Sequence, residues 1–171
     1  MITSSELAGH LRTFAATISA DRLGLALQRP EAWAIQTQCF TNVEKKVARD
    51  GGSGVPGWMF HHRLVVEIAG PGYLIAVHHA VWRAPSGHLM DVTPVHSDPK
   101  HWPYSINDGT VFLVDFAASP VTVSDRTYAL PSRFFAIGNG RDLIDHVERL
   151  NWEEQEQLRR QQVEGSGRHH P

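Results

Sequence analysis

The chain has only one cysteine, Cys39, among its 171 residues. A single thiol cannot form an internal disulfide, and structural zinc sites take several cysteine or histidine ligands. The spacing motifs CxxC and HExxH are both missing. A free thiol without a disulfide framework is typical of a reducing compartment, so we expect a cytoplasmic protein. Cys39 is therefore either a small buried apolar residue or a chemical group.

Excess charge and long apolar runs are missing as well. The chain has 16 Lys and Arg against 18 Asp and Glu, a formal net charge of −2, and no basic run longer than a pair. We therefore expect neither nucleic acid nor a membrane as a partner. No stretch approaches the roughly 18 apolar residues of a membrane span. The N-terminus lacks the basic and apolar regions of a signal peptide.

Helical periodicity occurs in the first third of the chain. Thr3 and Glu6 have the spacing of a capping box, and apolar residues then recur every three or four positions, which predicts a helix over 3–20. A second, short helix is predicted over 21–28. A third begins near Cys39 and ends at "RDGGSGVPG", where four glycines and a proline interrupt the pattern.

The middle of the chain changes to the alternation and turn signals of strands. The predicted strands are 58–69, 73–84, 88–94 and two segments within 108–130. A helix over 140–163 follows them. The order of helices, an antiparallel meander and a final helix predicts an α+β fold. We expect one globular domain over 1–163 and a flexible tail over 164–171.

Cys39 is predicted to lie in the first turn of its helix. Backbone N–H groups there have no intrahelical partner and the helix dipole is positive, so a thiolate is favoured and an oxyanion can be held beside the sulfur. Gln36 and Gln38, just upstream, are candidate side-chain donors to that oxyanion. Asn42, one helical turn after the thiol, is a candidate for a hydrogen bond to the site or to a substrate.

A histidine and an aspartate are predicted to meet on neighbouring strands. His79 and Asp91 are 12 positions apart, on two strands joined by a short turn. Because side chains alternate along a strand, a turn with an odd number of residues places them on one face, opposite each other or one diagonal step apart. The carboxylate can then orient the imidazole and leave its other nitrogen for a thiol. An even turn would place His78 there instead, and both alternatives remain open.

These residues resemble the catalytic triad of a known superfamily. A cysteine at a helix start, a histidine on a strand and an aspartate on the next strand follow the order of transglutaminase-like and papain-like cysteine enzymes. "HAVWRAPSGHLMDVTP" is similar to the transglutaminase pattern, in which His-Ala-Trp precedes a hairpin that ends in Asp-Pro-Thr. The set "QCFTNV…GG…GW…HHAVW…G…DVTP" also resembles a group of small bacterial and phage-encoded proteins of unassigned function. The resemblance covers residues 36–95, about a third of the chain.

The resemblance implies a papain-like or transglutaminase-like core with Cys39 as nucleophile, His79 as base and Asp91 as orienting acid. It has three departures. The spacing from histidine to aspartate is shorter than in transglutaminases, an extra residue separates His-Ala from Trp82, and no Gln-Gly-x-Cys-Gly run of the papain type is present. The reaction implied is acyl transfer, namely amide hydrolysis, deamidation or transamidation, on a peptide, protein or small amide substrate.

Two further hypotheses compete with this one. The 11 histidines include several that, with Asp91 or Cys39, could form a three-ligand zinc site. Adjacent histidines on a strand point to opposite faces, so each pair offers one ligand per face, and we expect no bound metal or other cofactor. A non-catalytic binding module on the same scaffold is the third hypothesis. The histidines concerned are His61, His62, His78, His79, His88, His96 and His101.

Trp58 and Trp82 have two possible roles. They fit the core of the sheet as large apolar side chains, and they could instead form the walls of a thiol cleft and exclude water from it. They are therefore included among the candidate substrate-binding residues.

Overall fold

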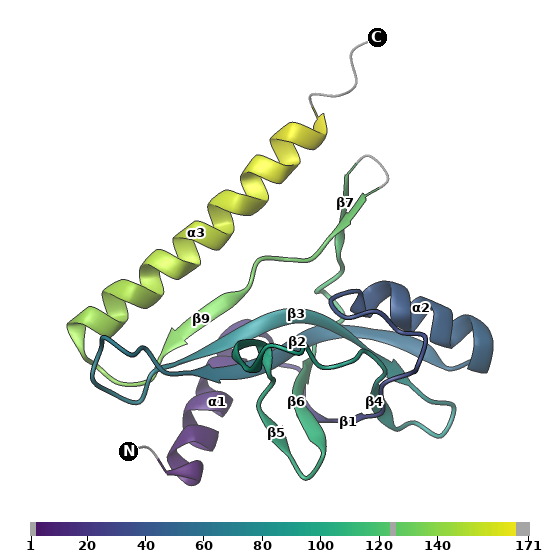
Figure 1. Cartoon of the computed structure of the whole chain (residues 1–171), viewed down its shortest axis with the longest axis horizontal. Coiled ribbons are helices and arrows are strands. Elements are labelled where there is room, and N and C mark those ends of the chain that lie inside the picture. Colours follow the sequence, from purple (N-terminus) through teal and green to yellow (C-terminus); the bar gives the residue numbers. More distant parts are fainter. Residues whose placement is uncertain (1–2, 124–125, 167–171) are drawn as a thin grey trace.

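The structure is a computed structural model that describes residues 3–123 and 126–166. Within these ranges the chain forms three α-helices and a mixed β-sheet, which confirms the α+β class (Figure 1). The helices are α1 (Ser4–Ile18), α2 (Cys39–Asp50) and α3 (Arg141–Ser166), with a short 3₁₀ turn, η1 (Pro99–His101). The strands are β1 (Leu23–Gln28), β2 (Ser53–Arg63), β3 (Tyr73–Arg83), β4 (Leu89–Asp91), β5 (Ser105–Ile106), β6 (Gly109–Val114), β7 (Val121–Val123), β8 (Arg126–Tyr128) and β9 (Arg133–Ala136).

Five of the strands close into a barrel. Their order is β1-β4-β3-β2-β6, and an antiparallel pairing of β1 with β6 completes the circle. Strands β2, β3 and β4 are antiparallel neighbours, but β1 runs parallel to β4. The sheet is therefore mixed and closed, and differs in this from the purely antiparallel meander that the sequence pattern predicted. Strand β9 pairs with the first residues of β3, and β7 and β8 form a separate ribbon.

The predicted helix over 21–28 is wrong, because residues 23–28 form strand β1. The segment "LGLALQ" pairs with β6 on one side and with β4 on the other. A helix of eight residues is marginal in water without tertiary support, whereas this segment gains two rows of backbone hydrogen bonds as a strand. Long-range pairing therefore overrides the local helical pattern.

Strand β2 begins five residues before its predicted start, inside the glycine-rich segment. Pro56 lies within it, opposite Ala80 of β3, and the Pro56 carbonyl accepts from the Asp115 N–H at 3.1 Å. In an antiparallel strand the N–H and C=O of one residue point to the same side. The nitrogen of Pro56, which has no hydrogen to donate, therefore points away from β3, toward the residues just beyond the end of β6. The proline therefore removes no hydrogen bond between β2 and β3.

The remaining helices follow the pattern closely. Thr3 caps α1, and its reciprocal hydrogen bonds with Glu6 form the predicted capping box. Helix α2 begins at Cys39, as predicted. Helix α3 continues to Ser166, so the predicted tail begins inside it, and residues 167–171 lie outside the described part of the chain. Within the described ranges no helix combines the length and apolar character needed to cross a membrane.

Three groups of buried side chains hold these elements together. Helix α1 packs against the outer face of the sheet at Trp58 and Phe60. Helix α2 packs against the same outer face farther along β3, at Ala80 and Trp82. The barrel interior is filled by Ala26, Val55, Val81 and Phe112.

The edge of β3 that faces away from β2 has two strand partners with a gap between them. Residues 73–76 pair with β9, and Trp82 and Arg83 pair with β4. Among the described strands none pairs with residues 77–81 on this edge. Figure 1 shows β9 and β4 at opposite ends of β3, with α2 close to the β4 end. The gap leaves room for the N-terminus of α2, and the candidate site lies there.

We expect Gly57→Ala to destabilise the barrel strongly. A Cβ at Gly57 would lie 2.0 Å from the Leu113 carbonyl oxygen, so β2 and β6 would have to separate. Overpacking against backbone costs about 3 kcal/mol or more. Gly24→Ala is the matched control, because a Cβ there meets nothing within 4 Å. Urea unfolding measures both variants, and equal free energies of unfolding would contradict the tight β2–β6 approach.

Candidate active site

Cys39 is the first residue of α2 and is buried, with 7% of its surface exposed. The first helical hydrogen bond runs from the Asn42 N–H to the Gln38 carbonyl at 2.9 Å. The N–H groups of the first turn therefore have no intrahelical acceptor. Gln38, the N-cap residue, makes no side-chain capping bond to them. These donors and the positive end of the helix lie beside the sulfur, the arrangement that stabilises an anion.

The loop before Cys39 is held in place by Asn42. The Asn42 side chain accepts from the Ile35 N–H at 3.1 Å and donates to the Ile35 carbonyl at 2.7 Å. It also donates to the Thr93 hydroxyl at 3.2 Å. Between these anchors Thr37 has a φ of 65°, in the left-handed region that β-branched residues rarely adopt. Asn42 thus joins the loop, α2 and the segment after β4 in one arrangement.

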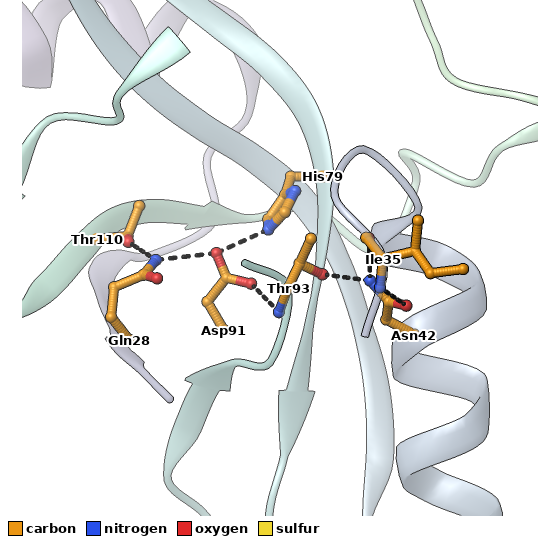
Figure 2. Close-up of polar contacts among 7 residues, drawn as sticks. All are labelled: Gln28, Ile35, Asn42, His79, Asp91, Thr93 and Thr110. Atoms are coloured by element: carbon orange, nitrogen blue, oxygen red, sulfur yellow. Dashed lines mark hydrogen bonds and ion pairs between the residues drawn. The ribbon is translucent and has the colours of Figure 1, made fainter. Parts of the chain in front are cut away.

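His79 and Asp91 meet as the alternation of side chains predicted. Arg83 pairs with Leu89, so the turn has five residues, an odd number. By extension of this register Asp91 faces Val81, and His79 is its diagonal neighbour. The His79 Nε2 and the Asp91 Oδ2 are 3.0 Å apart, and both side chains are buried (Figure 2). Because Nε2 is engaged by the carboxylate, Nδ1 is left for Cys39.

Asp91 is held by two further residues that sequence reasoning did not identify, and a third supports one of them. Its Oδ1 accepts from the Thr93 N–H, and its Oδ2 accepts from the Gln28 side chain, both at 3.0 Å. Gln28 Nε2 also donates to the Thr110 hydroxyl. Figure 2 shows these contacts as a continuous row from Thr110 to Asn42. Gln28 could not be found from the sequence, because the segment that ends with it was assigned to a helix.

His78 is fully occupied by the backbone and cannot serve as the base. Its Nε2 lies 2.7 Å from the Ala118 carbonyl, and its Nδ1 accepts from the Leu130 N–H at 2.8 Å. Its ring packs between Phe40 and Trp58. Both ring nitrogens have backbone partners, so His78 joins loops to the outer face of β3. Of the two histidines that the sequence left open as the base, only His79 contacts Asp91.

The electrostatic environment favours a thiolate–imidazolium pair. Burial raises the pKa of Cys39. The charge of His79, together with hydrogen bonds from His79 and the Ala80 N–H, lowers it by more, so the net pKa is below the ordinary value of a thiol. Burial lowers the pKa of His79, while the charges of Asp91 and Cys39 raise it well above the ordinary value. Both shifts favour the state in which the imidazole holds the proton and the sulfur is charged.

A cavity of about 420 Å³ opens beside the thiol. Its wall includes Cys39, His79 and Asp91 and several residues of the first turn of α2. A cavity of this size can hold a small ligand or one end of a peptide. Its other lining residues are Gln28, Thr37, Gln38, Phe40, Thr41, Met59, His61, Val77, His78, Thr93, Pro94, Val95, His96, His101, Pro103 and Ala129.

The five candidate binding residues have different positions. Gln38 lines the cavity and can act at the anion position. Gln36 donates to the Val95 carbonyl at 3.2 Å and does not line the cavity, and Asn42 holds the loop from behind.

Neither tryptophan lines the cavity. Trp58 Nε1 donates to Asp115 at 2.9 Å, and Trp82 Nε1 donates to the Gly51 carbonyl at 2.8 Å. Both rings lie on the outer face of the sheet, within the packing of α1 and α2. The structure therefore places them in the scaffold and away from the cleft wall, because even-numbered positions of β2 and β3 face outwards.

Among the described residues the histidines do not assemble a metal centre. Across residues 3–123 and 126–166, no group of three or more His, Cys, Asp or Glu side chains is arranged to hold a metal ion. His62 donates to the Pro71 carbonyl, and His96 accepts from the Asp98 N–H. The rings of His62 and His96 are therefore hydrogen-bonded to backbone groups.

We expect Cys39 to react with iodoacetamide at a pH where ordinary thiols are unreactive. Because the Cys39 pKa is lowered, thiolate persists as pH falls below about 8.5, the pKa of a free thiol, and is lost only at the lower folded pKa. His79→Ala removes the lowering cause and leaves burial, so the rate near pH 7 falls about tenfold or more. Alkylation rates across pH, with glutathione as the reference thiol, measure both. A midpoint equal to that of glutathione, unchanged in His79→Ala, would contradict the ion pair.

We expect Asn42→Ala to lower both stability and thiol reactivity. It leaves the Ile35 backbone groups unpaired, which costs about 2–4 kcal/mol, and releases the loop before Cys39. Asn151→Ala is a matched control, because Asn151 holds both backbone groups of Phe134 in the same way, far from the site. It lowers stability but leaves the alkylation rate of folded protein unchanged. Equal alkylation rates of Cys39 in the two folded variants would show that Asn42 has no effect on the reactivity of the thiol.

Comparison with known proteins adds no relative to these observations. No protein-family model matches the chain, and neither a curated protein nor a solved structure matches it.

Proposed function

We propose that the protein is a cysteine-dependent acyl-transfer enzyme. One observation carries the proposal: a buried imidazole is bound through Nε2 to the Asp91 carboxylate, and the same imidazole lowers the pKa of the Cys39 thiol. A structural cysteine needs no such neighbour, and an unpaired buried charge would be costly. The open N-terminal turn of α2 and the adjoining cavity supply an anion site and space for a substrate.

In the first half-reaction the thiolate attacks an amide carbonyl carbon. A C–S bond forms, and the carbonyl electrons move to oxygen, which accepts hydrogen bonds from the N–H groups of the first turn of α2 and from Gln38. Collapse of this intermediate breaks the C–N bond. His79 gives its Nδ1 proton to the departing amine, and a thioester on Cys39 remains.

In the second half-reaction neutral His79 takes a proton from the acceptor. The acceptor attacks the thioester carbonyl, the C–S bond breaks, and the thiolate and protonated imidazole are restored. Water as acceptor gives an amide hydrolase or deamidase, and an amine gives a transamidase. Asp91 keeps Nδ1 directed at the sulfur and stabilises the imidazolium throughout.

The proposal extends to the superfamily and to the substrate class. The order of a thiol at a helix start, a histidine on one strand and an aspartate on the next supports a transglutaminase-like or papain-like core. A peptide, a protein side-chain amide or a small amide is the substrate proposed, because the cavity beside the thiol is mostly apolar.

Acylation by p-nitrophenyl acetate tests the proposal. We expect a burst of one p-nitrophenolate per protein chain and one acetyl group on Cys39 by mass spectrometry, both lost in Cys39→Ala. Added glycinamide identifies the acceptor, because a transamidase forms N-acetylglycinamide and a hydrolase forms acetate only. A wild-type protein that acetylates no faster than glutathione would reject the enzyme and favour a non-catalytic binding module.

We expect Asp91→Asn to slow acetylation of Cys39 near pH 7 by about 10²-fold. The amide can donate to His79 Nε2, which leaves the proton on Nδ1, the wrong tautomer to accept one from the thiol. Serine enzymes lose about 10⁴-fold from this change, but a thiol ionises more readily and needs less help. The burst rate therefore recovers partly at alkaline pH. Loss of the folded state, with a normal rate in the folded fraction, would make Asp91 a structural residue.

A further inference from the structure

His61 is a buried imidazole without a partner. It lies on β2, is 4% exposed, and has no hydrogen-bond partner for either ring nitrogen. Its ring also lines the cavity beside Cys39. Two other histidines of the same sheet differ from it, because His62 donates to the Pro71 carbonyl and His78 joins two backbone groups. A buried polar group without a partner costs free energy, so a structural role does not explain His61.

His61 lies on the same face of the sheet as His79. Gly57 is the register partner of His79, and Met59 and His61 follow it at alternate positions of β2. At about 3.3 Å per residue, the Cα of His61 lies about 13 Å from that of Gly57 along the strand. Met59 also lines the cavity, so the wall is continuous from the thiol to this ring. A ligand that reaches both ends is extended and about three to four residues long.

The His61 ring is neutral at physiological pH. Burial and the charge of Arg63 lower its pKa to about 4, with smaller contributions from His79 and His101. A contact with the Trp102 backbone, outside ordinary hydrogen-bond geometry, raises the pKa against them. A neutral imidazole has one N–H donor and one nitrogen acceptor. A peptide or carboxamide group likewise offers a donor and an acceptor, so the two are complementary.

The rest of the cavity also suits a neutral amide better than a carboxylate. Among the described residues no lysine or arginine lines the cavity, and Phe40, Met59 and Val77 contribute apolar surface. The imidazolium of His79 is already engaged by Asp91 and Cys39. Gln28 adds a buried Oε1 without a partner, an acceptor that a carboxylate cannot satisfy and an amide N–H can.

We propose that His61 is a substrate-binding residue that hydrogen-bonds an uncharged amide of an extended, peptide-like substrate whose acyl carbon lies at Cys39. This inference rests on the proposed acyl-transfer function. It assigns the substrate class as peptides with a neutral amide group about three residues from the reacting carbon, and it makes His61 the residue that discriminates against a carboxylate there.

A matched pair of thiol-directed probes tests this assignment. Chloroacetyl-glycyl-glycinamide ends in a carboxamide, and chloroacetyl-glycyl-glycine ends in a carboxylate. With either, the Cys39 thiolate attacks the chloromethyl carbon, the C–S bond forms, the C–Cl bond breaks and chloride leaves. The dependence of the inactivation rate on probe concentration gives the binding constant KI and the limiting rate kinact separately.

We expect the wild-type protein to bind the carboxamide probe more tightly than the carboxylate probe. His61→Leu raises KI for the carboxamide about tenfold, abolishes the preference and leaves kinact unchanged, because the reacting atoms are at Cys39. His61→Gln, which keeps a neutral donor and acceptor, retains part of the preference. Leucine also removes an unpaired polar group from an apolar wall, so Tm is unchanged or higher.

His62→Leu is the control on the opposite face of β2. It loses the bond to the Pro71 carbonyl, so we expect a lower Tm and an unchanged KI for both probes. An unchanged KI in His61→Leu, a wild-type preference for the carboxylate, or failure of His61→Leu to fold would each overturn the inference. A normal p-nitrophenyl acetate burst at Cys39 in the same samples shows that the proposed function stands when the inference about His61 fails.

Discussion

The site depends on a gap in the hydrogen bonding of one strand edge. Strand β3 pairs with β9 at residues 73–76 and with β4 at Trp82 and Arg83, and the stretch between them remains without a strand partner in the described chain. An exposed edge must be covered, and the N-terminus of α2 covers this one. The Ala80 N–H is thereby directed to the Cys39 sulfur, where another strand would have accepted it. Val77, His78 and His79 of the same stretch line the cavity beside the thiol.

A buried carboxylate joins this edge to the barrel. Asp91 takes hydrogen bonds from His79 of β3, Gln28 of β1 and the Thr93 backbone, so three parts of the chain that are distant in sequence converge on one side chain. Gln28 is there because β1 closes the barrel beside β4. Barrel closure thus fixes the position of the carboxylate, and the carboxylate fixes the orientation of the imidazole. Farther along the same wall, the ring nitrogens of His61 are not part of such a network.

Local patterns predicted the elements whose stability is local. The capping box of α1 and the start of α2 at Cys39 follow from residues a few positions apart. The placement of His79 beside Asp91 followed from alternation along two strands joined by one short turn. The choice between His78 and His79 required the length of that turn, and the roles of Trp58 and Trp82 required the packing of α1 and α2. The roles of the two tryptophans therefore depend on helices that are distant from them in the sequence.

The sequence by itself determined the α+β class, the helix that presents the thiol and the pair of strands that present histidine and aspartate, because capping, periodicity and alternation act over a few residues. Tertiary structure decided what depends on distant pairing. It made residues 23–28 a strand, closed the barrel, and brought Gln28 to Asp91 and His61 into the wall of the cavity. Short segments with weak local preference take the conformation that satisfies the most backbone hydrogen bonds, and those partners lie elsewhere in the chain.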